Sequence, residues 1–380
     1  MDFELTSDQV ALRRTIREFA EAEIKPQVME WDEAQHFPTG ILRSLGNLGV
    51  LGAIFPEDLG GADLGYIDYA IIIEELARVD PSIALSVAAH VSLCTNHIYL
   101  HGSGEQRKKY VPKLAAGEWI GCWSLTEPEA GSDAAGTRTA AVLDGGHWVL
   151  NGSKTFTTNA HRADVCVATA VTDPRTEKPG ISAFVIEKGT PGFRTGRKEN
   201  KLGMRASDTG EMIFLNCRLP QDQLVGTRGS GFVDAMKVLD GGRISIAALS
   251  VGLAQGAYEA ALAYSKQRHQ FGKAIAEFQA IRHKLADMAT EIEASRLLTY
   301  QAGAMLNQKK RVTKQSSMAK LFASETAVRV ANEALQVHGG YGFIKDYPVE
   351  KFYRDVKLLT IGEGTSEIQR LIIARQILGE

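Results

Sequence analysis

A single carboxylate near the C-terminus, Glu363, stands between Gly362 and Gly364 in the stretch GEGTSEIQR. Apolar residues precede it, and the residues after it are typical of a helix start. A carboxylate that is desolvated in an apolar pocket gains basicity, and flanking glycines let the backbone and a substrate approach closely. The stretch therefore suits a general base, although most isolated glutamates are solvated loop acids or charges at a helix N-terminus.

Other residue patterns that commonly carry chemistry are absent from the sequence. The four cysteines lie far apart, with neither a CxxC pair nor the spacing of metal ligands, so we expect small buried residues in a reducing compartment and no metal site. They are Cys94, Cys122, Cys166 and Cys217. The glycine cluster GTRGSGF lacks the spacing and the βαβ context of a GxGxxG fingerprint, so a dinucleotide would not bind on a Rossmann crevice.

Length, composition and charge limit the class of protein. The chain has 380 residues, more than one compact core usually holds, so we expect two or three domains. Hydrophobic residues make up 44% and charged residues 23%, and the net charge of −2 indicates no nucleic-acid partner. The N-terminus begins with acids and resembles neither a signal nor a transit peptide. We expect no segment that spans a bilayer, and we predict a cytoplasmic protein without membrane insertion.

Helical periodicity dominates residues 1–120. Leu12, Ile16 and Phe19 fall on one face of a helix for which Ser7 is the predicted N-cap. A second helical stretch covers residues 66–102, and the glycines and proline of FPEDLGGADLG place a loop between the two.

Short strands are expected over residues 121–232. Asp144-Gly145 and Asn151-Gly152 are predicted hairpin turns between runs rich in Val, Trp and Thr. The runs ADVCVATAV, ISAFVIEK and EMIFLNCRLP continue this pattern without any intervening helix, which favours a small antiparallel sheet over βαβ units.

Helices return over residues 233–380. Residues 244–267 and 283–306 are each long enough for neighbouring helices of a four-helix bundle. The predicted fold class is α+β, with an N-terminal α-helical domain at 1–120, a middle β-sheet domain at 121–232 and a C-terminal α-helical domain at 233–380.

Four motifs resemble those of the acyl-CoA dehydrogenase family. They are TEPEAGSD at 126–133, RHQFGK at 268–273, LQVHGGYGF at 335–343 and GEGTSEIQR at 362–370, and they occur in family order and spacing. The resemblance covers essentially the whole chain. It implies an FAD-dependent α,β-dehydrogenation of an acyl-CoA thioester, in which a base removes the α-proton and the β-hydrogen leaves as hydride to flavin N5. It also implies electron transfer to an electron-transferring flavoprotein and a homotetramer.

The resemblance assigns flavin contacts residue by residue. Residues lining the isoalloxazine ring would be Trp123, Leu125, Thr126, Phe156 and Thr158, and Ser132 would lie near the pyrophosphate and the substrate. Phe156 stands where the family usually has tryptophan; without the motifs it would read as sheet core. The FAD of a neighbouring subunit would be contacted by Arg268, Phe271, Gln279, Gln336, Gly339 and Gly340. Thr365 and Glu367 would meet the cofactor at a helix N-terminus.

The resemblance also assigns the base and the coenzyme A contacts. Some members carry a glutamate directly before an arginine of the last domain, but Gly242 precedes Arg243 here, so the base falls to Glu363. Gly364 would let the Glu363 N–H point at the thioester carbonyl. Asp240 and Arg243 match positions near the pantetheine and adenine channel, and Arg243 would serve equally well as a buried ion-pair partner.

Three residues near the motifs are expected to have no catalytic or cofactor-binding role. Glu127 and Glu129 are expected to be surface acids of a turn, and His338 receives no role. The alternatives to a dehydrogenase are an acyl-CoA oxidase, whose chain is usually longer, and a non-catalytic FAD-bearing scaffold. Straight-chain members often have tyrosine before the base, whereas Gly362 stands here, so the acyl group stays open.

Overall fold

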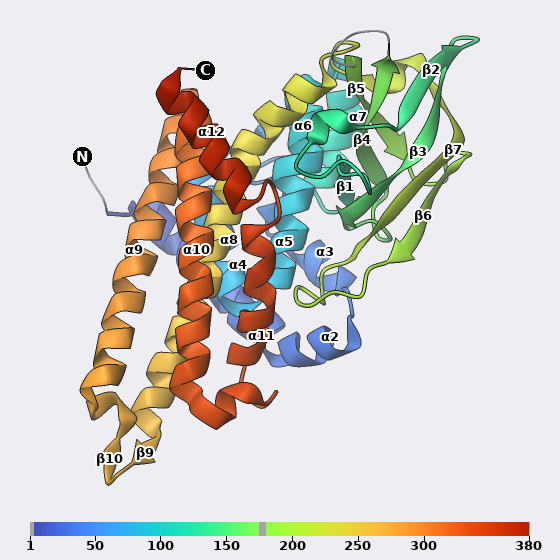
Figure 1. The fold of residues 1–380 in the computed structure, drawn as a ribbon. Coiled ribbons are helices and arrows are strands. Elements are labelled where there is room, and N and C mark those ends of the chain that lie inside the picture. The colour runs from blue at the N-terminus through green and yellow to red at the C-terminus, as the bar shows by residue number, and fades with distance from the viewer. Residues whose placement is uncertain (1–3, 175–179, 380) are drawn as a thin grey trace.

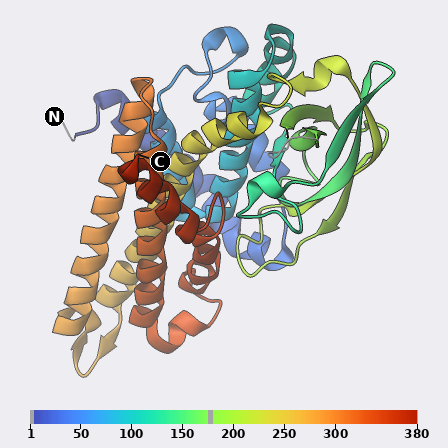
Figure 2. The ribbon, with the colours of Figure 1, turned by 45° about the horizontal axis from the view of Figure 1, so that its top comes forward.

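Helices form both ends of the chain and strands form its middle (Figure 1). The computed structural model describes residues 4–174 and 180–379. The sheet lies to one side of the long C-terminal helices, and the N-terminal helices fill the space between them (Figures 1 and 2). The α+β class and the order of helices, strands and helices expected from the sequence are confirmed. The exact domain boundaries at 120/121 and 232/233 stay a prediction.

The N-terminal part is a cluster of short helices. They are α1 (Ser7–Phe19), α2 (Val28–Ala34), α3 (Thr39–Asn47), α4 (Tyr66–Val79), α5 (Pro81–Ala88), α6 (Asn96–His101) and α7 (Gly104–Ala115). The predicted cap of the first helix is wrong by one residue, because Thr6 accepts a hydrogen bond from the Gln9 N–H and the Gln9 side chain accepts one from the Thr6 N–H. This reciprocal capping box satisfies two helix-terminal donors at once.

A π-helical segment, Ala89–Thr95, joins α5 to α6 without a break. The helix that results begins at Pro81 and is capped by Asp80, whose side chain accepts a hydrogen bond from the Ser82 N–H. Leu93 lies within the π segment and His97 lies just after it.

Two helical segments, Pro81–His101 and Gly231–Gln267, are long and apolar enough to cross a membrane by length and composition alone. This corrects the expectation that no segment would qualify. Within the fold, 89% and 67% of their most apolar windows are buried. Core helices of water-soluble proteins have the same composition, so the two segments are weak evidence for a membrane span.

The middle of the chain forms one eight-stranded sheet in the order β6-β7-β3-β2-β4-β5-β8, with β1 paired to β4. The strands are β1 (Gly121–Ser124), β2 (Ala140–Asp144), β3 (His147–Thr158), β4 (Val165–Asp173), β5 (Gly180–Glu187), β6 (Phe193–Lys198), β7 (Thr209–Pro220) and β8 (Leu224–Val225). Most pairs are antiparallel as predicted, but β4 pairs in parallel with both β1 and β2.

Strand β4 is buried on both faces and packs against two apolar cores. Its Val165 and Val167 face the large core shared with the helices, while Cys166 and Ala168 face a second core within the sheet domain. Side chains alternate between the two faces of a strand, and a strand buried on both faces reads as a continuous apolar run.

Only one of the two predicted hairpin turns is a turn. Gly145 and Gly146, with φ of +54° and +82°, connect β2 to β3. Gly152 instead lies inside β3 at a β-bulge, with φ of +147°. A Cβ on Gly152 would come within 2.5 Å of Thr139 Oγ1, so this glycine permits a close approach rather than a chain reversal.

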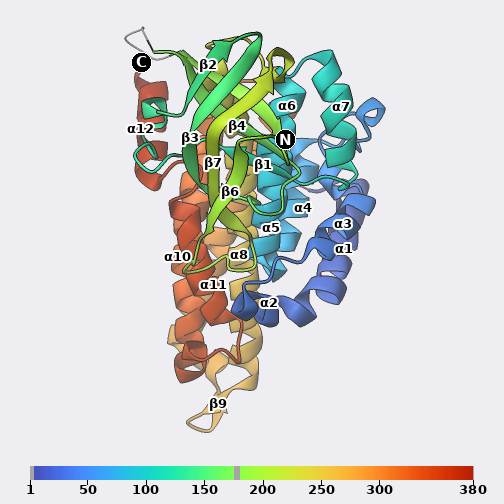
Figure 3. The same cartoon turned by 90° about the vertical axis from the view of Figure 1, so that its right-hand side faces the viewer.

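The C-terminal part is built on three long helices. Its elements are α8 (Gly231–Gln267), β9 (His269–Gln270), β10 (Lys273–Ala274), α9 (Gln279–Asn307), α10 (Thr313–His338), α11 (Val349–Asp355) and α12 (Ser366–Leu378). Helix α10 packs against α8, α9 and α12. The hairpin β9–β10 marks the end of the molecule farthest from the sheet (Figure 3).

Candidate active site

Glu363 lies in the short loop before α12, in a left-handed backbone conformation. Its φ is +52°, and that of Gly364 is +92°. A Cβ on Gly364 would lie 2.7 Å from Gln369 Nε2, whereas one on Gly362 would make only ordinary contacts, the nearest at 3.5 Å from the Leu358 carbonyl oxygen. Position 364 therefore requires glycine for its conformation. At position 362, neither the backbone conformation nor the contacts within this chain require a glycine.

The buried side chains of Gln369 and Lys320 form hydrogen bonds to the backbone of this loop. Gln369 Nε2 donates to the carbonyl oxygens of Glu363 and Gly364 at 3.1 and 3.0 Å. Lys320 Nζ, from α10, donates to the Gly364 carbonyl oxygen at 2.8 Å. Thr365 caps α12 by accepting a hydrogen bond from the Ile368 N–H. The loop is thus fixed at Glu363 and at the two residues that follow it.

The Glu363 carboxylate is turned into the protein. Its Oε2 is buried and has no hydrogen-bond partner among the described residues. A Cβ built on Gly242 of α8 would lie 2.3 Å from this oxygen and 2.9 Å from Leu93 Cδ2. Burial raises the pKa of Glu363 to about 7, although Lys320 and Arg243 oppose the shift. Glu363 is not a solvated loop acid, and its carboxylate has the properties of a general base at neutral pH.

Two of the residues expected along the flavin ring lie in the apolar cluster near this carboxylate. Trp123 and Leu125 pack on the apolar cluster that contains Leu93. The Thr155 N–H donates to the Thr126 carbonyl oxygen at 2.8 Å. This bond joins the loop after β1 to the end of β3, which carries Phe156 and Thr158.

Phe156 is exposed at a β-bulge. Its φ is +56°, the register of β3 against β7 shifts between Lys154 and Thr157, and 66% of the residue is exposed. The alternative of Phe156 as sheet core is therefore wrong, because the bulge turns its ring out of the sheet.

The expectation that Glu127 is a surface acid is also wrong. Glu127 is 6% exposed and its Oε1 lies 2.7 Å from Nζ of Lys154, which is fully buried. Burial alone would raise the pKa of Glu127, but the Lys154 charge and hydrogen bonds from Thr139 and the Arg138 N–H hold it at about 2. Lys154 also donates to the Leu125 carbonyl oxygen at 3.1 Å. This ion pair supports the loop that carries Thr126, while Glu129 remains exposed and pairs with Arg138.

His97 is a residue that sequence reasoning missed. The Trp123 Nε1–H donates to His97 Nδ1 at 3.0 Å. His97 is fully buried, and burial lowers its pKa to about 3. The neutral imidazole fixes the orientation of the Trp123 indole. The signal available in the sequence was a histidine within an otherwise apolar helical run.

Lys320 is a second missed residue. It lies on the buried side of α10 among small residues, between Ser316 and Ser324. A lysine on a stripe of alanines and serines was a visible signal, because lysine is almost never fully buried without a partner.

Asp240 and Arg243 form an ion pair one turn apart on α8. Arg243 is 4% exposed, and its Nη1 lies 2.6 Å from Asp240 Oδ1. Asp240 Oδ2 accepts a hydrogen bond from Thr313 at 2.7 Å. The ion-pair alternative for Arg243 is therefore present in the fold, while contact of either residue with coenzyme A stays a prediction.

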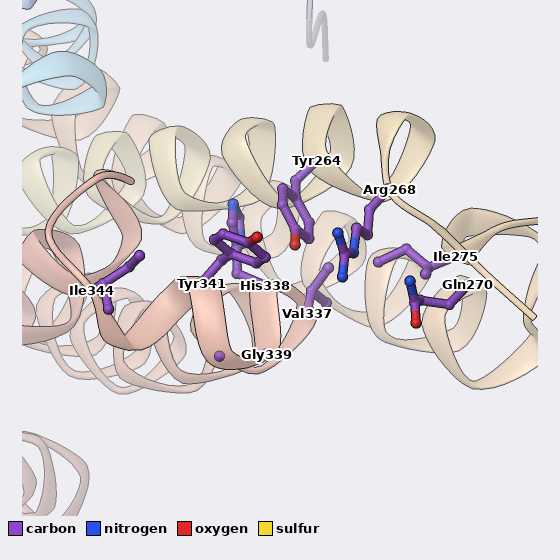
Figure 4. A pocket seen from close by; sticks show the side chains of 10 residues that line it. Tyr264, Arg268, Gln270, Ile275, Val337, His338, Gly339, Tyr341 and Ile344 are labelled. Carbon is purple, nitrogen blue, oxygen red and sulfur yellow. The ribbon is translucent and has the colours of Figure 1, made fainter.

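The remaining predicted contacts lie elsewhere. Ser132 and Glu367 are exposed, in the loop after β1 and in the first turn of α12. A second group surrounds the β9–β10 hairpin, where a cavity of about 530 Å³ is lined by Arg268, Gly339, Gly340 and Tyr341, among others (Figure 4). Phe271 stands 93% exposed at the hairpin, and Gln279 and Gln336 are exposed at the adjoining helix ends.

The cavity is built on packed aromatic rings. His338 is buried, and its ring stacks on that of Tyr264 with centroids 4.2 Å apart. The Arg268 guanidinium lies 5.3 Å from the centre of the Tyr341 ring. A Cβ on either Gly339 or Gly340 would meet no atom within 4 Å. The backbone of these two glycines is therefore accessible in the same cavity as the Arg268 guanidinium.

The second group does not meet Glu363 within one chain. Arg243 lies on α8 and Arg268 caps its C-terminus, 25 positions later in the sequence, which corresponds to about 37 Å along a helix axis. The structure thus places Trp123 and Leu125 in the apolar cluster near Glu363, and it places Arg268, Gly339 and Gly340 around the C-terminal end of α8.

Both groups fit the parts of an FAD molecule. The exposed Phe156 ring, on the strand end that also carries Thr158 and is bonded to the Thr126 backbone, offers an apolar surface of the kind that a flavin ring requires. At the far end, the Arg268 fork and the open glycine backbone are suited to a pyrophosphate.

Family models match nearly the entire chain. The N-terminal, middle and C-terminal domains of acyl-CoA dehydrogenase match residues 6–118, 122–217 and 229–378.

Characterised relatives align over their full length. An acyl-CoA dehydrogenase of Bacillus subtilis is 46% identical, with 99% of both chains covered. A short-chain specific acyl-CoA dehydrogenase of Clostridium acetobutylicum is also 46% identical, covering 99% of this chain and 100% of the relative. An acryloyl-CoA reductase (NADH) of Anaerotignum propionicum is 42% identical, covering 100% of this chain and 96% of the relative.

Solved structures share the same fold. Butyryl-CoA dehydrogenase from Megasphaera elsdenii superimposes with a TM-score of 0.97 at 41% identity, with 100% of both chains covered. A chain from a study of the electron transferring flavoprotein of Acidaminococcus fermentans gives 0.98 at 44% identity, again covering both chains completely. The prolyl acyl carrier protein oxidase AnaB gives 0.95 at 31% identity, covering 99% of this chain and 100% of that one. The chain belongs to the acyl-CoA dehydrogenase family of FAD-dependent oxidoreductases.

Proposed function

We propose that the protein oxidises a short acyl-CoA thioester to the 2-enoyl-CoA, with Glu363 as the base that removes the α-proton. The observation that carries this proposal is the Glu363 carboxylate, which is packed against Gly242 beside Leu93, with an unpartnered Oε2 and a pKa raised to about 7. A base whose pKa lies near the working pH is partly ionised and still strong enough to accept a proton.

The residues around Glu363 would divide the remaining tasks. Trp123, Leu125, Thr126, Phe156 and Thr158 would hold the flavin ring, which supplies the acceptor for the β-hydrogen leaving as hydride. The Glu363 N–H would donate to the thioester oxygen, where charge develops as the α-proton leaves. Gly364 allows the backbone conformation that this requires. Entry of an acyl chain would expel water and strengthen both interactions.

The size of the acyl group is inferred from relatives. The enzyme from Clostridium acetobutylicum is short-chain specific and that from Megasphaera elsdenii acts on butyryl-CoA, as their names state. We therefore propose a short acyl chain. Ser132, Asp240 and Arg243 would contact the coenzyme A portion.

The assembly and the electron acceptor complete the proposal. Arg268, Phe271, Gln279, Gln336, Gly339 and Gly340 would contact the FAD of a neighbouring subunit in a homotetramer, while Thr365 and Glu367 would meet the cofactor within the same chain. Electrons would pass to an electron-transferring flavoprotein, as the match to a chain from such a system suggests. We propose a cytoplasmic location.

An oxidase is the principal alternative, and chain length does not exclude it. The match to AnaB covers 100% of that oxidase and 99% of this chain, so an oxidase of this fold can have the same length as this chain. Oxygen uptake during turnover of butyryl-CoA, compared with reduction of an artificial acceptor, distinguishes a dehydrogenase from an oxidase. A non-catalytic scaffold would leave the flavin oxidised under anaerobic butyryl-CoA.

Replacement of the base tests the central assignment. Glu363→Gln keeps the size of the side chain but cannot accept a proton, so we expect FAD content and acyl-CoA binding to persist. The rate of anaerobic flavin bleaching by butyryl-CoA should fall by about a hundred- to ten-thousandfold. Stopped-flow absorbance gives the rate, and the perturbation of the flavin spectrum gives binding.

The control is Glu57→Gln, because Glu57 is an exposed carboxylate in the N-terminal part of the chain. It should bleach at the wild-type rate. If Glu363→Gln bleached at a near-normal rate, the base would have to be a residue other than Glu363.

A further inference from the structure

Lys320 differs from the other fully buried lysines of the protein. Lys154 and Lys351 each lie within 2.8 Å of a carboxylate oxygen. Lys320 is 0% exposed, yet within residues 4–174 and 180–379 it forms no ion pair, and its recorded hydrogen bond is to the Gly364 carbonyl oxygen. A buried ammonium is costly unless charge or hydrogen bonds compensate it.

The nearest compensation comes from the catalytic loop. Burial lowers the pKa of Lys320 to about 8, and the negative charge that opposes this most strongly is that of Glu363. In return, burial raises the pKa of Glu363, and Lys320 is the first group that opposes that rise. The two side chains therefore interact through their charges without an ion-pair contact, and Lys320 also bonds to the carbonyl oxygen of Gly364, the residue after Glu363.

Positioning of the loop does not by itself require this charge. Gln369, a neutral residue, already donates to the carbonyl oxygens of both Glu363 and Gly364. A neutral donor at position 320 would satisfy the Gly364 carbonyl equally well. The hydrogen bond to Gly364 alone therefore does not explain why a fully buried, positively charged lysine occupies position 320.

The other charged and titratable groups around the pair do not replace Lys320. Arg243 of α8 is held 2.6 Å from Asp240, which compensates its charge. Burial raises the pKa of Tyr69 of α4, so its hydroxyl stays neutral. Glu325 of α10 and Glu367 of α12 also act on Lys320, and both oppose the lowering of its pKa.

We propose that Lys320 is a positioning residue of the reaction, whose buried ammonium holds the Gly364 carbonyl and supplies the positive charge that favours the ionised form of Glu363. The inference rests on the proposed function, because it concerns the same base. Without this charge, Glu363 would be protonated over more of the neutral range and unable to accept the α-proton.

The test compares three replacements of Lys320 in the FAD-loaded enzyme. The rate of anaerobic bleaching by butyryl-CoA is measured between pH 5.5 and 9.5. In the wild type this rate should fall as the pH drops below about 7, because Glu363 becomes protonated. Lys320→Gln keeps a donor for Gly364 but loses the charge, so the fall should begin about one pH unit higher, with a near-normal rate at pH 9.5.

The other two replacements separate charge from contact. Lys320→Arg keeps the charge and should leave the pH dependence in place. Lys320→Met loses both charge and donor, and should show the same pH shift together with a lower rate at pH 9.5. Lys314→Gln, a change of a partly exposed lysine on the same helix, is the matched control and should change neither.

Gln369→Leu provides an independent check that does not alter any charge. It should lower the rate at pH 9.5 and leave the pH dependence unchanged. An unshifted profile in Lys320→Gln, or an equal shift in Gln369→Leu, overturns the proposal, because loop geometry would then set the profile. These failures differ from failure of the proposed function, in which Glu363→Gln itself would remain active.

Discussion

Position 242 determines how much room the Glu363 carboxylate has. The carboxylate reaches α8 at a residue without a side chain, and a Cβ there would lie 2.3 Å from Oε2. The sequence motif around Glu363 gives no indication of this, because the two positions are 121 residues apart in the chain. Gly242 is therefore as important for the position of the Glu363 carboxylate as the two glycines beside Glu363.

Gly242→Ala should slow catalysis without releasing the flavin. The added methyl group must displace the tip of the Glu363 side chain, and a misplacement of about 1 Å can lower the rate about a hundredfold. We expect kcat for butyryl-CoA to fall by about ten- to a hundredfold, with unchanged FAD content. Gly40→Ala, on α3 where a Cβ meets nothing within 4 Å, is the control. A normal kcat in Gly242→Ala would show that the carboxylate has another position from which it works.

At the scale of elements, one buried ion pair supports the segments that carry the residues proposed to line the flavin ring. Lys154 of β3 bonds to Glu127 and to the Leu125 carbonyl oxygen, so the strand and the loop after β1 are fixed to each other. Removing one partner of a buried pair leaves an uncompensated charge, which typically costs about 3–5 kcal/mol.

Lys154→Met should therefore lower the free energy of unfolding by about 3 kcal/mol or more and reduce FAD affinity. The double variant Lys154→Met/Glu127→Gln removes both charges and should recover part of the loss. Denaturant unfolding and flavin content after dialysis measure the two effects. Glu129→Gln, in the exposed pair with Arg138, should change stability by only about 0.5 kcal/mol. If the double variant were no more stable than Lys154→Met, the charge argument would be incorrect.

The sequence predicted elements more reliably than the contacts between them. Periodicity identified the helical ends and the strands, because it reflects which face of an element is buried. It misread Glu127 as exposed, because the partner that buries it, Lys154, lies 27 residues away. It also could not show the left-handed backbone of Phe156 or Glu363, since neither residue type favours that conformation. Lys320 escaped notice because its role depends on the fold of a loop 44 residues later.

At the scale of the whole molecule, α8 connects the two groups of residues that we propose to bind FAD. Arg243, in the N-terminal half of α8, lies near Glu363, and Arg268 lines the second cavity at the C-terminal end of the helix. With about 37 Å between them, the two groups can serve one FAD only if a second chain brings its Arg268 end to the first chain's Glu363 end.

Two inactive variants should therefore restore activity when they are combined. Arg268→Ala should bind FAD weakly, and Glu363→Gln should bind FAD without turnover. In mixed oligomers, a subunit with an intact Glu363 can receive an intact Arg268 from its neighbour, so co-expression should yield measurable butyryl-CoA oxidation. Dilution that dissociates the oligomer should release FAD at the same time. A stable monomer with full flavin content, or no activity in mixtures, would rule out a shared site.

The π-helical segment Ala89–Thr95 alters the angular phase of the helix that contains it. A π turn closes its hydrogen bond one residue later than an α turn, and each residue of a helix turns the chain by about 100°. Leu93 and His97 therefore face Gly242 and Trp123 in a phase that an unbroken α-helix starting at Pro81 would not give. A relative that lacks the π turn would present different side chains at the same count from the helix start. In such a relative, residue-by-residue correspondence across this helix would be offset by one after Thr95, and the loss of a single residue there would rotate His97 away from the indole.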